Sequence, residues 1–223
     1  MILPHVSYWL LKKEFQFEWR SKNAVQGLLL YTLSIGFILY SSFLFQEHLI
    51  NAAVWSALFW ISLLFSAMSA VVKSFLGDRG HTDSYYYRIM SAHHLLFAKT
   101  FYNTLLLVVL FLLSMVIFSV LFGSVIADTG LFATLGILTC AALGGALTLL
   151  ASIAAKVRNS HLIMAVLGFP VTVSIILMAV SGTRNCIDGL GLEALWRELL
   201  VLGAINAISL AVSFLLFPYI WRS

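Results

Sequence analysis

The run TFYNTLLLVVLFLLSMVIFSVLFGSVIA, residues 100–127, decides the fold: it is 28 residues long and contains no Asp, Glu, Lys or Arg. Five further runs share this property: 24–46, 48–72, 129–155, 159–183 and 199–221. A helix rises about 1.5 Å per residue, so each run is long enough to cross a hydrocarbon core of about 30 Å. The sequence therefore predicts an all-α, polytopic membrane protein with six transmembrane helices.

Composition supports the same conclusion independently. Hydrophobic residues make up 61% of the chain and charged residues 10%, with a mean hydropathy of +1.00. Too little polar surface remains to cover a water-soluble globule, so we expect one transmembrane domain over residues 1–223 and no nucleic-acid partner. The expected spans cover about 27–45, 52–72, 101–122, 131–155, 162–180 and 199–218.

The basic residues fix the orientation. If the N-terminus is cytoplasmic, the segments on the inner side hold 11 of the 13 Lys and Arg residues, and only Arg184 and Arg197 lie outside. Positively charged segments resist translocation. We therefore expect both the N-terminus and the C-terminus in the cytoplasm.

Three segments between or before the spans have patterns of their own. Residues 5–22 combine an apolar stripe with a basic one, which predicts a helix lying in the inner interface. The inside loop 73–99 mixes charged and aromatic residues, a composition typical of a short helix inserted into a groove of a partner protein. The outside segment 183–198 places apolar residues at helical spacing, which indicates a short interfacial or re-entrant helix.

The fourth span is rich in small residues. Ala141 and Gly145, and likewise Ala142 and Ala146, form small-xxx-small pairs. In lipid, such pairs allow the backbones of two helices to approach closely. The pattern fits either the centre of a single bundle or a contact between subunits, and the sequence leaves both open.

The fifth span carries Pro170 in its interior. Proline lacks the N–H group of the helical hydrogen bond, and its ring clashes with the preceding turn. We expect the helix to be bent or broken there, as a fixed kink or as a hinge.

Several kinds of chemistry have no residues to support them in this sequence. The six charge-free runs disfavour a proton- or sodium-coupled transporter, which usually keeps a carboxylate near the bilayer midplane. Asn103 and Asn206 are the most polar residues of the spans, and we expect both to donate hydrogen bonds between helices. No zinc spacing is present, and depth argues against a disulfide between Cys140 and Cys186.

Nucleotide hydrolysis also lacks its residues, because no glycine-rich phosphate loop is present and no lysine follows a glycine. If the protein moves a solute against a gradient, another polypeptide must hydrolyse the ATP. The loop 73–99 is the natural place for that partner to bind, since it is the longest segment on the inner side.

Five segments carry a resemblance to a known family: KSFLGDRG (73–80), YYYRI (85–89), AKTFYN (98–103), MAVLGFP (164–170) and LFPYIWR (216–222). They resemble the haem exporter protein B family (CcmB), the membrane subunit of the ABC-type complex in cytochrome c maturation. The sequence is most similar to the branch of that family found in Bacteroidetes-like bacteria. The resemblance extends over essentially the whole chain.

The resemblance implies an ABC-2 type permease in the bacterial cytoplasmic (inner) membrane, with an N-terminal elbow helix, six spans and a cytoplasmic coupling helix that docks on the ATPase subunit CcmA. Phe75 and Asp78 match the Phe-x-x-Asp of the family's coupling loop, and Gly80, Tyr85 and Tyr86 complete the expected docking surface. Where the proteobacterial pattern continues with Asp-Gly-Ser/Thr-Leu-Glu, this chain has residues 80–84, GHTDS.

The same resemblance implies partners and a substrate. The complex would contain the haem-handling subunit CcmC, the haem chaperone CcmE and a second copy of this chain, with ATP bound by the partner subunit and no cofactor or metal bound by this one. Haem is then a candidate substrate, and His48 is a candidate haem contact because it faces outside. In the expected mechanism, closure of the ATPases tilts spans one, two and five.

Two other functions remain open at this point. An ABC-2 permease for another lipid or drug would share the same spans and the same inside loop. A structural assembly subunit that transports nothing would share them as well.

Overall fold

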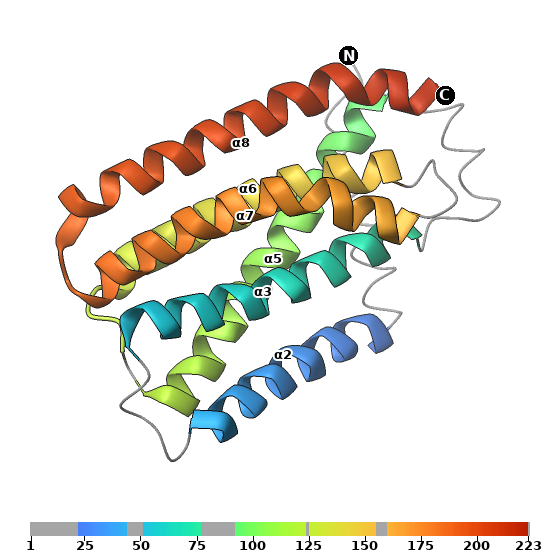
Figure 1. The fold of residues 1–223 in the computed structure, drawn as a ribbon. Coiled ribbons are helices and arrows are strands. Elements are labelled where there is room, and N and C mark those ends of the chain that lie inside the picture. Colours follow the sequence, from blue (N-terminus) through green and yellow to red (C-terminus); the bar gives the residue numbers. More distant parts are fainter. Residues whose placement is uncertain (1–21, 44–50, 77–91, 124, 155–159, 223) are drawn as a thin grey trace.

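A computed structural model gives the fold, and it describes residues 22–43, 51–76, 92–123, 125–154 and 160–222. Six helices make up this part of the chain (Figure 1): α2 (Lys22–Phe43), α3 (Ala52–Leu76), α5 (Ala92–Phe122), α6 (Thr129–Ala154), α7 (Ser160–Ile187) and α8 (Gly191–Arg222). The predicted interfacial helix at residues 5–22 lies almost entirely outside the described residues.

Most of these helices are long and apolar enough to cross a membrane. Among the described residues, five candidate spans are present: Ala52–Val71, His93–Phe122, Thr129–Ala154, Val166–Ile187 and Gly191–Phe217. The first helix contributes a shorter apolar stretch, Leu30–Phe43. The prediction of an all-α, multi-pass membrane protein is confirmed.

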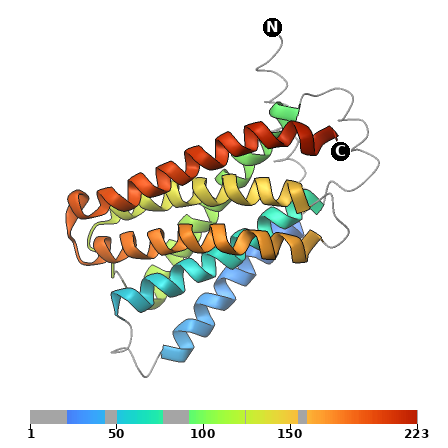
Figure 2. The ribbon, with the colours of Figure 1, turned by 45° about the horizontal axis from the view of Figure 1, so that its top comes forward.

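The helices run up and down the bundle in alternation. α2, α5 and α7 begin, and α3, α6 and α8 end, toward the same end of the bundle (Figures 1 and 2). We call this the inner end, because the distribution of basic residues places it in the cytoplasm, and we call the opposite one the outer end. Lys22 begins α2 and Arg222 ends α8, so the first and last described helices both reach the inner end.

Several helices extend beyond the spans predicted from the sequence. α3 continues to Leu76 and α5 already begins at Ala92, so both ends of the predicted loop 73–99 are helical. With 31 residues, α5 is about 46 Å long, which exceeds the hydrocarbon core by several turns. The loop between these two helices is therefore shorter than expected.

The outside segment 183–198 also differs from the prediction. α7 continues to Ile187, and α8 is one helix from Gly191 to Arg222 rather than a short interfacial helix followed by a span. The connection is tight because Gly189 adopts a φ of 66° and the N–H of Leu190 donates to the carbonyl of Asn185 over 3.1 Å. This is the geometry of a Schellman motif, which ends a helix abruptly and satisfies its last carbonyl groups.

Helix starts at the outer end are set by side-chain caps. The Asn51 Oδ1 accepts from the N–H of Val54 at 2.9 Å and so caps α3. The Asp128 Oδ1 accepts from the N–H of Leu131 at 3.0 Å and caps α6 in the same way. The fourth span, expected from about residue 131, thus begins at Thr129 directly after its cap.

The centre of the bundle is α6. It contacts α3, α5, α7 and α8, whereas α5 crosses the other helices obliquely (Figures 1 and 2). From Ala142 to Leu149 every residue of α6 is buried. Small residues allow α6 to pack this closely against its neighbours. A β-carbon on Gly144 would approach the Cα of Thr104 of α5 to 3.0 Å, so a larger residue there would push the two helices apart.

The outer half of the bundle is filled by an aromatic cluster. Its buried members, contributed by α3, α5 and α6, are Trp55, Phe59, Trp60, Phe111, Phe118 and Phe132. Phe59 lies at the centre, with ring centroids 5.2 Å from Phe118 and 5.4 Å from Phe132 in edge-on geometry. Such pairs contribute about 0.5–1.5 kcal/mol each beyond burial, and they hold together three helices that the hydrophobic effect does not drive together within lipid.

Replacing Gly144 with alanine tests the close approach of α5 and α6. The added methyl group meets the backbone of Thr104, so we expect the free energy of unfolding to fall by about 1–3 kcal/mol. Gly203→Ala in α8 is the matched control: no atom lies within 4 Å of its β-carbon position, and it should leave stability unchanged or raise it by up to about 1 kcal/mol. The thermal unfolding midpoint in detergent measures both, and equal midpoints for the two variants would contradict the packing argument.

Candidate functional site

The inner ends of α3 and α5 bracket the segment in which the sequence places ATPase docking. Phe75 lies in the last turn of α3, where the structure describes its backbone. Asp78, Gly80, Tyr85 and Tyr86 lie outside the described residues. The structure thus places one of the five predicted docking residues, at the inner end of a helix that is anchored in the aromatic cluster.

Contacts to α6 and α8 hold the inner half of α5. Asn103 is fully buried and its Nδ2 donates to the Thr148 Oγ1 of α6 over 2.8 Å, which confirms the predicted role as a donor between helices. Nearer the inner end, the His93 ring stacks on Phe214 of α8, with centroids 4.2 Å apart. The helix that leaves the loop is therefore tied to two neighbours.

A different contact ties α3 to α7. The Trp60 Nε1 donates to the Thr183 Oγ1 at 2.7 Å, and the Thr183 hydroxyl donates in turn to the carbonyl of Ala179. Both side chains are fully buried. The sequence analysis missed this pair: Trp60 and Thr183 are 123 residues apart, and only the fold brings them together. The pair therefore joins the outer halves of α3 and α7.

α7 itself runs without a break through Pro170. The Pro170 side chain is exposed, and the hydroxyl of Thr172 donates to the carbonyl of Gly168 over 2.8 Å, while that of Ser174 donates to the carbonyl of Pro170 over 3.0 Å. Hydroxyl groups that bond back to the preceding turn often bend helices, as proline does. Of the two expected outcomes, the helix is not broken at Pro170, and the kink or hinge stays a prediction.

The small residues of the fourth span lie mostly inside the bundle. Ala142 is fully buried, Ala146 is 3% exposed and Gly145 is buried, whereas Ala141 is partly exposed. A β-carbon on Gly145 would come within 3.8 Å of Ser209 of α8. The pair of Ala142 and Ala146 therefore faces other helices of the same chain.

Asn206 of α8 lies on a face that contacts α6. Its Nδ2 is 3.5 Å from the carbonyl of Leu138, so it donates between helices as expected, over a long distance. Cys140 and Cys186 are both buried and both free. His48 lies outside the described residues.

Two ionisable side chains are buried near the ends of the bundle, which the sequence analysis did not predict. Lys99 is 4% exposed and Glu198 is 8% exposed. Both were expected just outside the spans, but α5 and α8 begin earlier than predicted and turn these residues toward neighbouring helices. The expected starts of the third and sixth spans, at 101 and 199, are therefore corrected: both helices begin earlier and include these two residues.

Only one of the two carboxylate oxygens of Glu198 has a hydrogen-bond partner among the described residues. Its Oε1 accepts from the Ser181 Oγ of α7 at 2.8 Å. Its Oε2 is buried and has no hydrogen-bond partner in the described part of the chain. Burying a carboxylate oxygen without a donor costs free energy, so this contact between α7 and α8 is weaker than its burial suggests.

No catalytic or metal-binding group comes together in the described residues. A search of these residues for three or more His, Cys, Asp or Glu side chains that could hold a metal ion finds none. What they do contain is a bundle of long apolar helices that brackets a charged and aromatic segment at its inner end. That arrangement defines a multi-pass membrane protein.

Comparison with known proteins identifies the family. The model of the CcmB protein family matches residues 5–221, nearly the whole chain, and the chain belongs to this family. Neither a search of curated proteins nor a search of solved structures returned a match.

Membership gives the biochemical role. CcmB is the permease subunit of the ABC-type haem exporter of cytochrome c maturation, in the bacterial inner membrane. It is not catalytic, because ATP hydrolysis belongs to a separate ATPase subunit, CcmA, with which it forms the ABC complex.

Ser181→Ala tests the contact to Glu198. The substitution leaves the buried carboxylate without its donor, and we expect the free energy of unfolding to fall by about 1–3 kcal/mol. Glu198→Leu removes the carboxylate together with its unpartnered oxygen, so it should lower the free energy of unfolding by less. Adding Ser181→Ala to Glu198→Leu should lower it little further. Thermal unfolding of the wild type, the two single variants and the double variant gives a double-mutant cycle. If the stability losses of the two single variants simply add up in the double variant, the two side chains do not interact.

Proposed function

We propose that the CcmA ATPase docks on this chain through the segment 73–99, with Phe75 and Asp78 as the principal contacts and Gly80, Tyr85 and Tyr86 around them. The proposal rests on one structural observation above all: Phe75 lies in the last turn of α3, at the inner end of a helix whose outer half is locked into the aromatic cluster. A force applied there acts on a packed helix rather than on a free loop.

The proposed mechanism is mechanical. Closure of the ATPases displaces the inner ends of α3 and α5. The hydrogen bond of Trp60 to Thr183 passes the movement of α3 to α7, while the hydrogen bond of Asn103 to Thr148 keeps α5 attached to α6. Pro170 then serves as the place where α7 bends, because this residue gives no N–H to the helix.

The remaining partners follow from the family. We propose that two copies of this chain act together with the haem-handling subunit CcmC, and that ATP hydrolysis releases the haem-loaded chaperone CcmE. Haem is the proposed substrate of the complex, and His48 remains the candidate contact to it. The closer relationship to the Bacteroidetes-like branch also remains a prediction.

Docking is tested by recovering CcmA with the purified membrane subunit. The variant Phe75→Ala/Asp78→Ala removes an aromatic anchor and a charge, so recovery should fall about fivefold to thirtyfold. The matched control is Phe101→Ala/Asp188→Ala, which changes a 58% exposed side chain within α5 and an exposed one in the turn at the outer end. Equal recovery of CcmA by the two variants would remove the docking assignment.

The role in cytochrome c maturation is tested in a deletion strain. Without this gene, cells should lose covalently bound haem in their c-type cytochromes, measured by haem staining of separated proteins. A plasmid with the wild-type gene should restore it, and one with the Phe75→Ala/Asp78→Ala variant should not. A deletion strain with normal haem staining would contradict the assigned pathway.

A further inference from the structure

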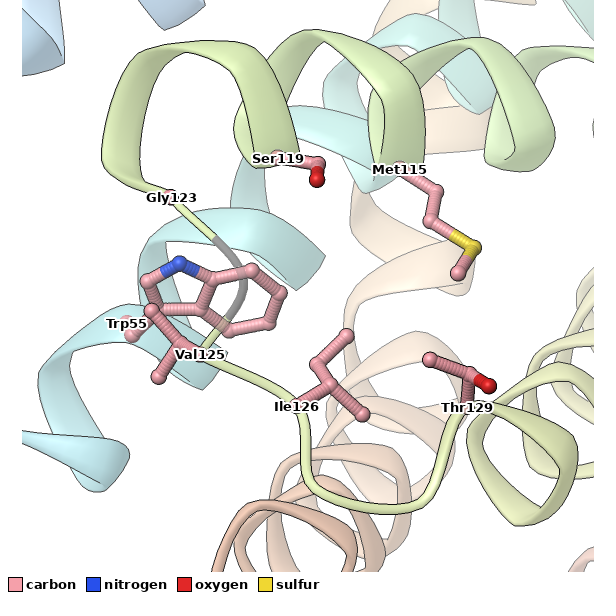
Figure 3. Close-up of a pocket in the computed structure, with 7 residues that line it drawn as sticks. All are labelled: Trp55, Met115, Ser119, Gly123, Val125, Ile126 and Thr129. Carbon is pink, nitrogen blue, oxygen red and sulfur yellow. The ribbon is translucent and has the colours of Figure 1, made fainter.

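A cavity opens between the outer ends of α5 and α6, where the two helices diverge (Figure 3). It is partly open to the surface and has a volume of about 30 Å³, and it is lined by Trp55, Met115, Ser119, Val125, Ile126 and Thr129. Trp55 comes from α3 and forms one wall, while the α5–α6 connection runs along another. We call this space the outer wedge.

The wedge contains a hydrogen-bond donor that has no acceptor. Trp55 is 2% exposed, and its Nε1 is buried without a partner in the described part of the chain. The ring cannot easily turn to find one, because it stacks on Phe59 at 5.3 Å and meets Phe118 edge-on at 5.7 Å. Buried tryptophan N–H groups usually have partners, so the wedge is incomplete as it stands.

Space for an acceptor exists on the side of the donor. In Figure 3 the indole nitrogen lies on the ring edge toward Gly123, and the Ser119 hydroxyl points into the wedge. Gly123 has a φ of 78°, and a β-carbon built on it meets no described residue within 4 Å apart from its own chain neighbours. A carbonyl group can therefore approach from the Gly123 side, while an apolar chain occupies the space between Met115 and Ile126.

The position of the wedge decides what fills it. The neighbouring residues of α5, Val116 and Val120, are 60% and 78% exposed, so this surface of the helix faces the hydrocarbon. Space beside a bilayer does not stay empty, because an empty wedge forfeits dispersion contacts on all its walls. A mainly apolar lining disfavours water as the filling, and a volume of about 30 Å³ admits a short stretch of an apolar chain but not a porphyrin.

We propose that the outer wedge is a binding site for a phospholipid of the outer leaflet. One acyl chain lies between α5 and α6, and its ester carbonyl accepts the hydrogen bond of the Trp55 indole. Acyl esters supply the required combination of a flexible apolar chain and an acceptor at one end. The site lies at the opposite end of the bundle from the segment 73–99, so it does not depend on how the ATPase docks.

The test uses the complex in liposomes of phosphatidylethanolamine and phosphatidylglycerol. They are doped with a phosphatidylethanolamine that carries a photoreactive diazirine on the acyl chain close to the ester. After irradiation, mass spectrometry of peptides locates the lipid adducts. We expect adducts on the lining residues from Met115 to Thr129.

Three variants separate specific binding from general contact with lipid. Ser119→Leu fills the wedge and should abolish the adducts on its lining. Trp55→Phe keeps the ring but removes the donor, and should lower their yield about threefold to tenfold, the range of one hydrogen bond. Val120→Leu alters the adjacent exposed surface and should leave the yield unchanged.

Each outcome decides the proposal. Loss of lining adducts in Ser119→Leu, with a reduced yield in Trp55→Phe and a normal yield in Val120→Leu, supports the lipid site. Adducts confined to Val116 and Val120, or lining adducts that none of the variants changes, would overturn it, and the first of these results would mean that the wedge holds water only. Elution of each variant as an intact complex in size-exclusion chromatography confirms that it has folded.

Discussion

The close approach of α6 to its neighbours is the constraint on which the rest of this bundle depends. Lipid tails are as apolar as leucine, so helices in a membrane gain little from burying hydrophobic surface against each other. They must gain from dispersion contacts and hydrogen bonds, and both require short distances between backbones. Two glycines of α6 provide these short distances to α5: Gly144 lies against Thr104, and Gly136 lies against Phe111. A β-carbon on either glycine would overlap the facing residue. The polar pair of Asn103 and Thr148 forms at the same contact between α5 and α6.

The sequence was sufficient to predict the features that depend on charge and length. Runs without charged residues identify helices that cross a membrane, and the five longest apolar helices correspond to five of these runs. Glycines and alanines in the run 129–155 likewise identified the most closely packed helix. What the sequence could not predict were the helix ends, since charged residues such as Lys99 and Glu198 are tolerated in helices that continue past the hydrocarbon. It also could not predict which polar side chains meet, because Trp60 and Thr183 become neighbours only when α3 packs against α7.

The candidate site shows the same division. Phe75 and Asp78 were selected as docking residues because their spacing resembles that of the CcmB family, with no information on their place in the fold. The structure supports this proposal through the position of Phe75. α3 carries Phe75 at its inner end and Trp55, Phe59 and Trp60 in its outer half, on a single helix of 25 residues. A helix that is rigid over this length converts a small displacement at one end into a tilt at the other. The aromatic cluster then determines which neighbours must follow.

This geometry bears on how the proposed movement would be distributed. α6 is packed on several sides, so tilting it would break contacts with α3, α5, α7 and α8 together. α2 exposes many large apolar side chains, among them Leu30 at 67% and Phe37 at 58%, and lipid can replace its contacts with α3 and α5 at lower cost. Movement driven from the inner end would therefore leave α6 in place and shift α2 more readily than the helices packed against α6. The outer wedge lies between the outer ends of α5 and α6 and shares Trp55 with the aromatic cluster, so a tilt of α5 relative to α6 would change its width and the cluster together.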